Sequence, residues 1–154
     1  MPYEFKLTRR IEFAETDMAG IVHFSNFFRM MELTEHAFFR SLGFSIHAEV
    51  AGEIIGWPRV SATCDYARPL RFEDEVEIRL MIAEIRQRSI RYQFTFTKSG
   101  ESAEIARGSV VAVCATVDPV TRQLAPRAIP ESLREQLTQA PSDLIKQRPS
   151  LSQT

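Results

Sequence analysis

The sequence has 154 residues and a formal net charge of −1 at pH 7, a length that favours a single domain. Its hydrophobic fraction of 44% is ordinary for a globular protein. It contains no run of about 18 apolar residues that could span a membrane. The near-neutral charge gives no reason to expect nucleic acid as a partner.

The two cysteines, Cys64 and Cys114, form neither a CxxC pair nor a cluster with metal-ligand spacing. We interpret them as small buried residues in a reducing compartment. The first residues lack the basic-then-apolar pattern of a signal peptide. We therefore expect a cytoplasmic enzyme or binding protein without a metal site or a membrane partner.

The hydrophobic pattern of the N-terminal half changes from the period of a strand to that of a helix. Residues 3–13 alternate between apolar and polar side chains, which predicts a strand with one buried face. Residues 14–22 form a loop. From Phe24 to Leu42 apolar residues recur at steps of three and four, which predicts a long helix buried on most sides and ended by Gly43.

The rest of the chain predicts consecutive strands. Alternation indicates strands at 60–66, 76–82 and 90–96, and a fifth strand at 103–117 is apolar on both parities, so we expect it in the middle of the sheet. A short helix follows Pro130. Residues 1–140 are expected to form one domain, and the polar residues 141–154 a loose tail.

This order of elements indicates an α+β fold. A helix that is apolar on most sides must be covered, and one antiparallel sheet curled around it is the simplest solution. The short connections after residue 59 suit antiparallel pairing.

The loop before the long helix holds the residues with chemical potential. Asp17 lies there with Gly20, close to the helix N-terminus, whose free N–H groups favour negative charge. A carboxylate beside donors for an oxyanion is the minimal equipment for acyl transfer. The structural alternative is that Asp17 only caps the helix or forms the turn.

Two segments resemble the 4-hydroxybenzoyl-CoA thioesterase family. The first is Glu15-Thr16-Asp17-Met18-Ala19-Gly20-Ile21-Val22-His23-Phe24-Ser25-Asn26-Phe27, and the second runs from Asp65-Tyr66-Ala67-Arg68-Pro69-Leu70 to Asp74. The resemblance implies a hotdog fold, with an antiparallel sheet wrapped around one long central helix. It also implies homodimers or homotetramers with active sites at subunit interfaces.

The resemblance assigns roles to individual positions. Asp17 falls on the catalytic aspartate, the backbone N–H of Phe24 on the oxyanion donor, and Glu32 on an acidic helix position that recurs in many relatives. Many bacterial relatives carry Tyr-His where this chain has His23-Phe24, so His23 is a candidate proton shuttle or acyl contact and equally a polar residue at the edge of the cleft. Further candidates for substrate binding in the same segment are Gly20, Val22 and Asn26.

Three arginines could hold the phosphates of coenzyme A. Arg86, Arg88 and Arg91 cluster where the third predicted strand meets the fourth, and in the family this region, together with a neighbouring subunit, often meets the nucleotide. Arg86 and Arg88 share a strand parity that Arg91 does not, so their convergence needs a turn or bulge. An exposed hairpin is the alternative.

Together these features predict an acyl-CoA thioesterase that needs no cofactor, with coenzyme A as part of the substrate and Asp17 as nucleophile or general base. Trp57, Phe24, Phe27 and Phe28 suggest room for an aromatic or short to medium acyl group. We rank aromatic acyl groups first, because the segment around His23 also resembles thioesterases that release 1,4-dihydroxy-2-naphthoate. The alternatives are an acyl-carrier-protein thioesterase and a hotdog protein that binds acyl-CoA without turnover.

Overall fold

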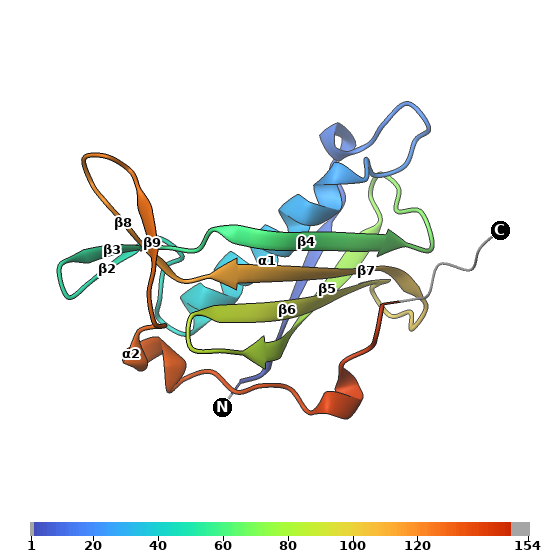
Figure 1. Ribbon diagram of the computed structural model, residues 1–154. Helices are drawn as coiled ribbons and strands as arrows, with labels where there is room; N and C mark the ends of the chain where they lie inside the picture. Colours follow the sequence, from blue (N-terminus) through green and yellow to red (C-terminus); the bar gives the residue numbers. More distant parts are fainter. Residues whose placement is uncertain (1, 149–154) are drawn as a thin grey trace.

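The computed structural model describes residues 2–148. One five-stranded antiparallel sheet curves around a single long helix, α1 (Ser25–Ser41), as the sequence predicted (Figure 1). The strand order in this sheet is β1-β5-β6-β7-β4. These strands span Glu4–Arg10 (β1), Arg59–Tyr66 (β4), Glu75–Ile85 (β5), Ser89–Lys98 (β6) and Glu104–Val113 (β7).

The core lies between α1 and the concave face of the sheet. Helix α1 buries Phe27, Met30, Met31, Phe38 and Phe39, all at most 3% exposed. Alternate residues of β5 and β6 meet them from the sheet and are fully buried: Val76, Ile78, Leu80, Ile82, Ile90, Tyr92, Phe94 and Phe96. Each buried side chain of this size contributes roughly 1.5–3 kcal/mol, so this interface is the main stabilising feature of the fold.

The predicted fifth strand is interrupted. Strand β7 lies between β6 and β4, inside the sheet as expected, but it ends at Val113. Cys114 leaves the ladder because its N–H donates to the carbonyl of Arg88 and its own carbonyl accepts from Arg127. Strand β8 (Ala115–Val117) then joins a second sheet in the order β2-β3-β8-β9 with strands that the sequence did not reveal, Ala48–Val50 (β2), Glu53–Gly56 (β3) and Leu124–Pro126 (β9).

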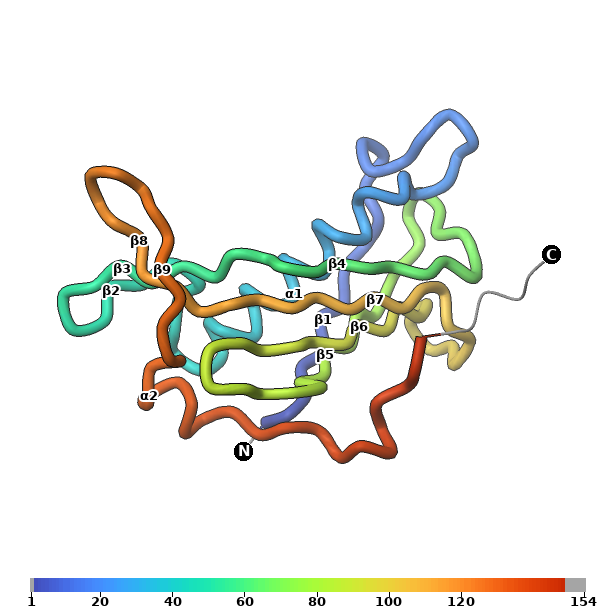
Figure 2. Tube along the Cα trace, in the orientation of Figure 1, coloured from blue at the N-terminus to red at the C-terminus, as the bar shows by residue number. Residues whose placement is uncertain are grey.

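The C-terminal segment does not form a loose tail at residues 141–148. After the short helix α2 (Glu131–Arg134), residues 139–148 cross the convex face of the large sheet, and we call them the strap (Figure 2). The Ala140 N–H donates to the carbonyl of Ile82 at 2.8 Å, and the Gln93 side chain bonds both backbone groups of Lys146 at 2.6 and 3.1 Å. The expectation of a loose tail is thus wrong for 141–148, and residues 149–154 lie outside the described residues.

No helix within residues 2–148 is long and apolar enough to cross a membrane. The longest, α1, spans 17 residues and carries charged side chains along its exposed face.

Candidate active site

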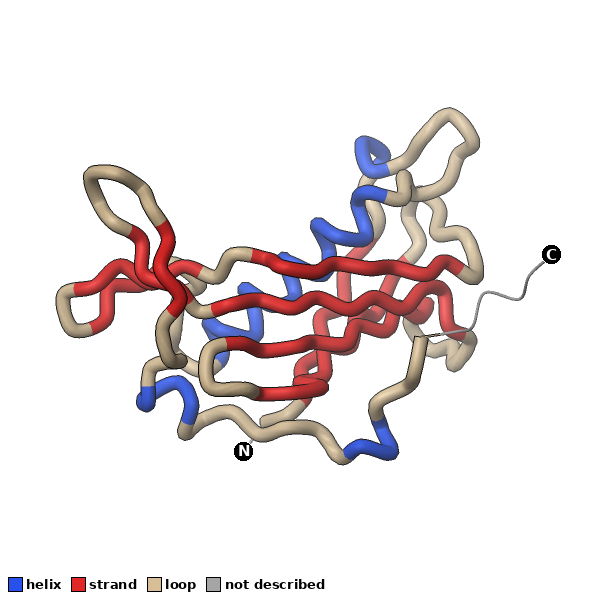
Figure 3. The backbone as a smooth tube through the Cα atoms, in the orientation of Figure 1, coloured by secondary structure: helices blue, strands red, loops and turns tan. Residues whose placement is uncertain are grey.

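Asp17 lies in a tight loop at the end of the large sheet, between β1 and the start of α1 (Figure 3). The loop is closed by backbone hydrogen bonds, in which the Asp17 N–H donates to Ile21 at 2.8 Å and the Gly20 N–H donates to Asp17 at 3.0 Å. Gly20 has a φ of +77°, a conformation that side chains disfavour. The turn therefore needs glycine at this position for its backbone angle.

One oxygen of the Asp17 carboxylate is engaged and the other is not. Oδ1 accepts a hydrogen bond from the Ala19 N–H at 2.8 Å. No other group in residues 2–148 hydrogen-bonds this carboxylate. Oδ1 therefore fixes the orientation of the side chain, and Oδ2 remains available to a substrate or a water molecule.

A single carbonyl ties the Asp17 loop to the helix. The Glu15 carbonyl accepts from the His23 N–H at 2.9 Å and from the Asn26 side-chain amide at 2.8 Å. Asn26 was predicted to bind substrate or cap the helix. Its amide instead joins the first turn of α1 to the loop, and it does not line the cavity that contains Asp17.

The Phe24 N–H lies at the start of α1 and is a candidate oxyanion donor. The His23 carbonyl accepts from Asn26 at 2.9 Å, and the Phe24 N–H points the opposite way across the same trans peptide. Within residues 2–148 this N–H has no hydrogen-bond partner. It is therefore a free donor at the N-terminus of a 17-residue helix, where the helix dipole favours negative charge.

A cavity of about 500 Å³ contains both of these residues. Its lining is mostly apolar and comes from Asp17, Ile21, Val22, Phe24, Phe27, Tyr66, Ala67, Arg68, Pro69 and Leu70. The second motif seen in the sequence supplies the last five, so the fold brings both motifs to one site. We call this space the Asp17 cavity.

Sequence reasoning did not identify Tyr66 as a site residue. Its hydroxyl donates to the carbonyl of Phe24 at 3.0 Å, and its ring meets Phe27 edge to face at 5.0 Å between centroids. Partial burial raises the pKa of the Tyr66 hydroxyl, which keeps it protonated as a donor. The hydrogen bond fixes the first turn of α1, beside the free N–H.

Asp17 also borders a second, open hollow. Phe13, Met18, Gly20 and Phe72 line this hollow of about 530 Å³, and the rings of Phe13 and Phe72 meet edge to face. Phe13 is 74% exposed and Met18 is fully exposed. Asp17 thus lies between a mostly apolar cavity and an exposed apolar surface, an arrangement that suits a substrate extending past it on both sides.

The side chain of His23 points away from Asp17. Its Nδ1 lies 2.7 Å from the Ser25 hydroxyl and 3.3 Å from the Ser25 N–H, and its ring stacks on Phe24. His23 lines neither the Asp17 cavity nor the adjoining hollow. The structure therefore favours the interpretation of His23 as an exposed residue at the start of the helix.

The acidic residues of α1 lie apart from Asp17 in one chain. Glu32 is exposed and pairs with His36 at 3.8 Å; it borders a small hollow against β4. Glu35 is 1% exposed and forms a two-pronged ion pair with Arg59. Burial raises the pKa of Glu35, and Arg59 limits that rise. This pair could not be predicted from the sequence, because Arg59 follows an irregular segment.

The three arginines are not brought together at the site. Arg86 and Arg88 are exposed in the turn between β5 and β6, at the opposite end of the sheet from the Asp17 loop (Figure 1). Arg91 lies on the convex face of β6, beside the strap. Trp57 is also remote, since it packs on Phe39 in the core. No group of acidic, histidine or cysteine residues within 2–148 could hold a metal ion.

Comparison with known proteins identifies the family of this chain. A family model described as the thioesterase-like superfamily matches residues 11–137. The chain is 29% identical over 124 residues to 1,4-dihydroxy-2-naphthoyl-CoA hydrolase of Prochlorococcus marinus, covering 76% of this chain and 77% of that protein. It is 27% identical over 129 residues to the acyl-CoA thioester hydrolase YbgC of Escherichia coli, covering 84% and 92%.

Solved structures show the same fold. A gentisyl-coenzyme A thioesterase is 35% identical with a TM-score of 0.73, and the match covers 84% of this chain and 99% of that one. A variant of 4-hydroxybenzoyl-CoA thioesterase bound to 4-hydroxybenzoyl-CoA has a TM-score of 0.76 at 20% identity, covering 89% and 100%. The chain belongs to the thioesterase-like superfamily and is a hotdog-fold enzyme that acts on acyl-CoA thioesters.

Proposed function

We propose that Asp17 drives the hydrolysis of an aromatic acyl-CoA in the Asp17 cavity. One observation carries the proposal: the carboxylate of Asp17 and the unpaired N–H of Phe24 border the same apolar space. An acyl-transfer site needs these two groups, one to attack or activate water and one to hold the oxyanion.

In the nucleophilic form of this mechanism the thioester carbonyl oxygen accepts a hydrogen bond from the Phe24 N–H. Oδ2 of Asp17 attacks the carbonyl carbon, the C–S bond breaks, and coenzyme A leaves as a thiolate that takes a proton from solvent. Water then hydrolyses the resulting mixed anhydride, which releases the acid and restores the carboxylate.

In the general-base form Oδ2 accepts a proton from a water molecule, and that water attacks the same carbonyl carbon. The tetrahedral oxyanion again lies against the Phe24 N–H. Both forms require an ionised Asp17 within about 3 Å of its target. In both forms coenzyme A enters as part of the substrate and no cofactor takes part.

Several features support an aromatic acyl group. The rings of Phe24, Phe27 and Tyr66 border the cavity, and offset or edge-to-face contacts with a substrate ring would add to its burial. Two relatives named above act on ring-bearing acyl groups, 1,4-dihydroxy-2-naphthoyl and gentisyl. Short and medium aliphatic acyl-CoA esters are the competing substrates, and an acyl-carrier protein is the competing carrier.

We also propose that the enzyme works as a homodimer formed through β4, with further pairing to a homotetramer. Strand β4 is an edge of the large sheet, and its residues Val60 and Tyr66 are 63% and 45% exposed. An unpaired edge of this kind invites a second copy. Tyr66 belongs to the Asp17 cavity, so such pairing would complete the wall of the site.

Antiparallel pairing of β4 would give Arg86 and Arg88 a role across the dimer. In such a pair the Arg59 end of β4 in one copy lies beside the Tyr66 end of β4 in the other. The β5–β6 turn is at the Arg59 end of the sheet, so the partner's turn comes to the end that carries Asp17. Three to four strand spacings of about 4.8 Å separate that turn from β4 of the first copy, roughly 14–19 Å. The partner's Arg86 and Arg88 would then meet the nucleotide phosphates of coenzyme A.

A substrate panel tests the proposed function. Purified enzyme is assayed with benzoyl-type, naphthoyl-type, and short and medium aliphatic CoA esters, with released thiol detected by a chromogenic reagent. We expect the highest kcat/KM for a ring-bearing ester. A preference for aliphatic esters would contradict the aromatic assignment, and release only from acyl-carrier-protein thioesters would contradict the carrier assignment.

A further inference from the structure

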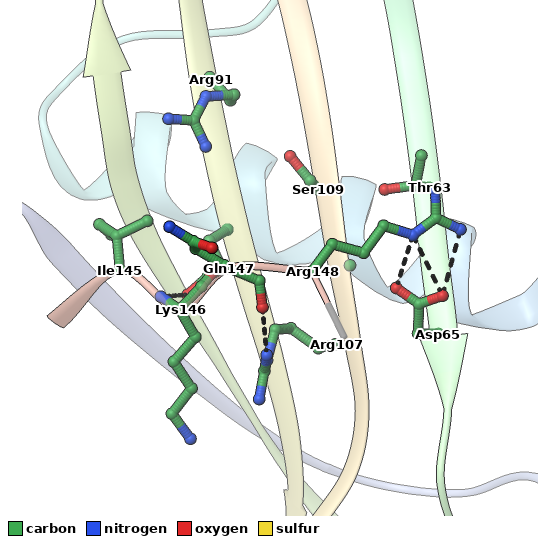
Figure 4. Close-up of a pocket in the computed structure, with 11 residues that line it drawn as sticks. Thr63, Asp65, Arg91, Arg107, Ser109, Ile145, Lys146, Gln147 and Arg148 are labelled. Carbon is green, nitrogen blue, oxygen red and sulfur yellow. Dashed lines mark hydrogen bonds and ion pairs between the residues drawn. The ribbon is translucent and has the colours of Figure 1, made fainter. Parts of the chain in front are cut away.

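A second cavity, of about 370 Å³, lies on the convex face of the large sheet beneath the strap (Figure 4). We call it the strap cavity; it is lined by Thr63, Asp65, Arg91, Gln93, Arg107, Gly108, Ser109 and residues 145–148. It is separate from the Asp17 cavity, because side chains alternate along β4. Asp65 faces the strap, whereas its neighbour Tyr66 faces the Asp17 cavity. Its volume falls within the range of small-molecule sites.

Positive charge dominates the lining of the strap cavity. Four cationic side chains border it, from Arg91, Arg107, Lys146 and Arg148, against the single carboxylate of Asp65. The cations come from two strands and the strap, and Figure 4 shows the Ser109 hydroxyl between Arg91 and Arg148, whereas the Lys146 side chain extends away from it. Guanidinium groups with hydroxyls are the donors that proteins use for phosphate oxygens.

Nearby carboxylates balance these cations only in part, and Arg148 pairs with Asp65 at 3.1 Å. Glu104 is shared by Arg107 at 2.6 Å and Lys146 at 3.4 Å. Glu84 is shared by Arg86 and Arg91, and its distance to Arg91, 3.7 Å, exceeds a hydrogen bond. Among residues 2–148 the Arg91 guanidinium makes no hydrogen bond at all.

Arg107 adds an unsatisfied buried donor. Its side chain is only 15% exposed; its two terminal nitrogens bond Glu104 and the Gln147 carbonyl, while its Nε–H is buried without a partner in the described structure. A buried donor without an acceptor costs free energy, which an acceptor oxygen bound nearby would remove. The strap cavity therefore combines an excess of positive charge, hydrogen-bond donors without a partner in the described structure, and room for a ligand.

We propose that the strap cavity binds a phosphate group, with Arg91, Arg107 and Ser109 from the sheet and Arg148 from the strap as its donors. Binding would hold the strap against the sheet, because donors from both would share one anion. The phosphate could be inorganic or the terminal phosphomonoester of a nucleotide, such as the 3′-phosphate of coenzyme A. The proposal concerns binding alone and does not depend on the proposed mechanism.

Calorimetric titration with inorganic phosphate tests the site, with sodium chloride at matched ionic strength as the reference. We expect saturable binding that weakens at least about tenfold in Arg91→Gln, the loss typical of a charge-assisted hydrogen bond. Arg134→Gln is the matched control, since Arg134 is exposed in α2 and does not line the cavity. Ser109→Ala gives an independent check with little change in charge or size, and we expect about threefold weaker binding.

Two titrations identify the source of the phosphate. If coenzyme A is the natural ligand, Arg91→Gln weakens binding of coenzyme A but leaves binding of 3′-dephospho-coenzyme A unchanged. If free phosphate is the ligand, the variant weakens only inorganic phosphate. Phosphate that binds no better than chloride, or equally well to wild type and Arg91→Gln, would overturn the proposal whatever the outcome of the hydrolysis assays.

Discussion

At the scale of single residues, the candidate site depends on short backbone contacts. Asp17 is oriented by the Ala19 N–H, and its loop is attached to α1 through the carbonyl of Glu15. The sequence allowed Asp17 and the Phe24 N–H to be predicted, because the motif around them is local. The role of Tyr66 could not be predicted from spacing, because its hydroxyl reaches Phe24 across 42 residues of sequence.

The first prediction concerns Tyr66. Tyr66→Phe keeps the ring against Phe27 and removes only the hydrogen bond to the Phe24 carbonyl. Because that bond fixes the turn that carries the oxyanion donor, we expect kcat to fall about 3- to 10-fold with KM little changed, as for about 1 kcal/mol of lost transition-state stabilisation. Steady-state kinetics measure kcat and KM, and a thermal melt measures the stability of the variant.

Two results would contradict this role. A rise in KM with constant kcat would mean that the Tyr66 hydroxyl contacts the substrate rather than positions the helix. A parallel loss of kcat and thermal midpoint would mean that the bond only stabilises the fold. Thr116→Val, which removes a hydroxyl bonded to a carbonyl in the small sheet, serves as a control for the general cost of such a bond.

At the scale of elements, hydrophobic periodicity predicted α1 and all five strands of the large sheet to within a few residues. It failed at the small sheet, because strands of three or four residues are too short to show a period. Periodicity also did not indicate that Glu35 of α1 is buried. Glu35 can be buried only because Arg59, 24 residues later, provides the opposite charge.

The second prediction concerns this ion pair. The pKa of Glu35 is raised in the folded state by burial, so its ionisation costs stability as the pH rises above its ordinary value of 4.5. Arg59→Met removes the compensating charge, which raises the pKa further. We expect the variant to lose about 3–5 kcal/mol of unfolding free energy at pH 7.

The unfolding free energy of Arg59→Met should be closer to that of wild type near pH 4, because Glu35 can then be buried in its neutral form. Urea unfolding at both pH values measures the difference. A loss of stability that is constant from pH 4 to pH 7 would show that Arg59 contributes packing rather than charge compensation.

At the scale of the whole molecule, the two faces of the large sheet carry different chemistry. The concave face holds α1 and leads to the Asp17 cavity, while the convex face is crossed by the strap. The strap could not be predicted, because its contacts use a glutamine side chain and backbone groups instead of an apolar pattern. Its polar composition therefore suggested a loose tail.

The third prediction concerns assembly. If β4 is the dimer edge, Val60→Lys buries a charged side chain in the interface and should weaken self-association at least about tenfold. Light scattering at micromolar concentration measures the mass. Val120→Lys is the matched control, because Val120 is also exposed but lies in the turn between β8 and β9. A wild-type monomer would contradict the proposed dimer, and with it the role of the partner's arginines.

The most direct test of the account is the kcat of Asp17→Asn on the best acyl-CoA substrate. The substitution keeps the oxygen that accepts from the Ala19 N–H and removes the charge that a nucleophile or general base needs. We predict that kcat falls at least ~10²-fold with the thermal midpoint nearly unchanged. His23→Ala should lower kcat by a smaller factor. If Asp17 only shaped the turn, asparagine would replace it well, so a variant that keeps more than about half of the wild-type kcat would contradict the proposed mechanism.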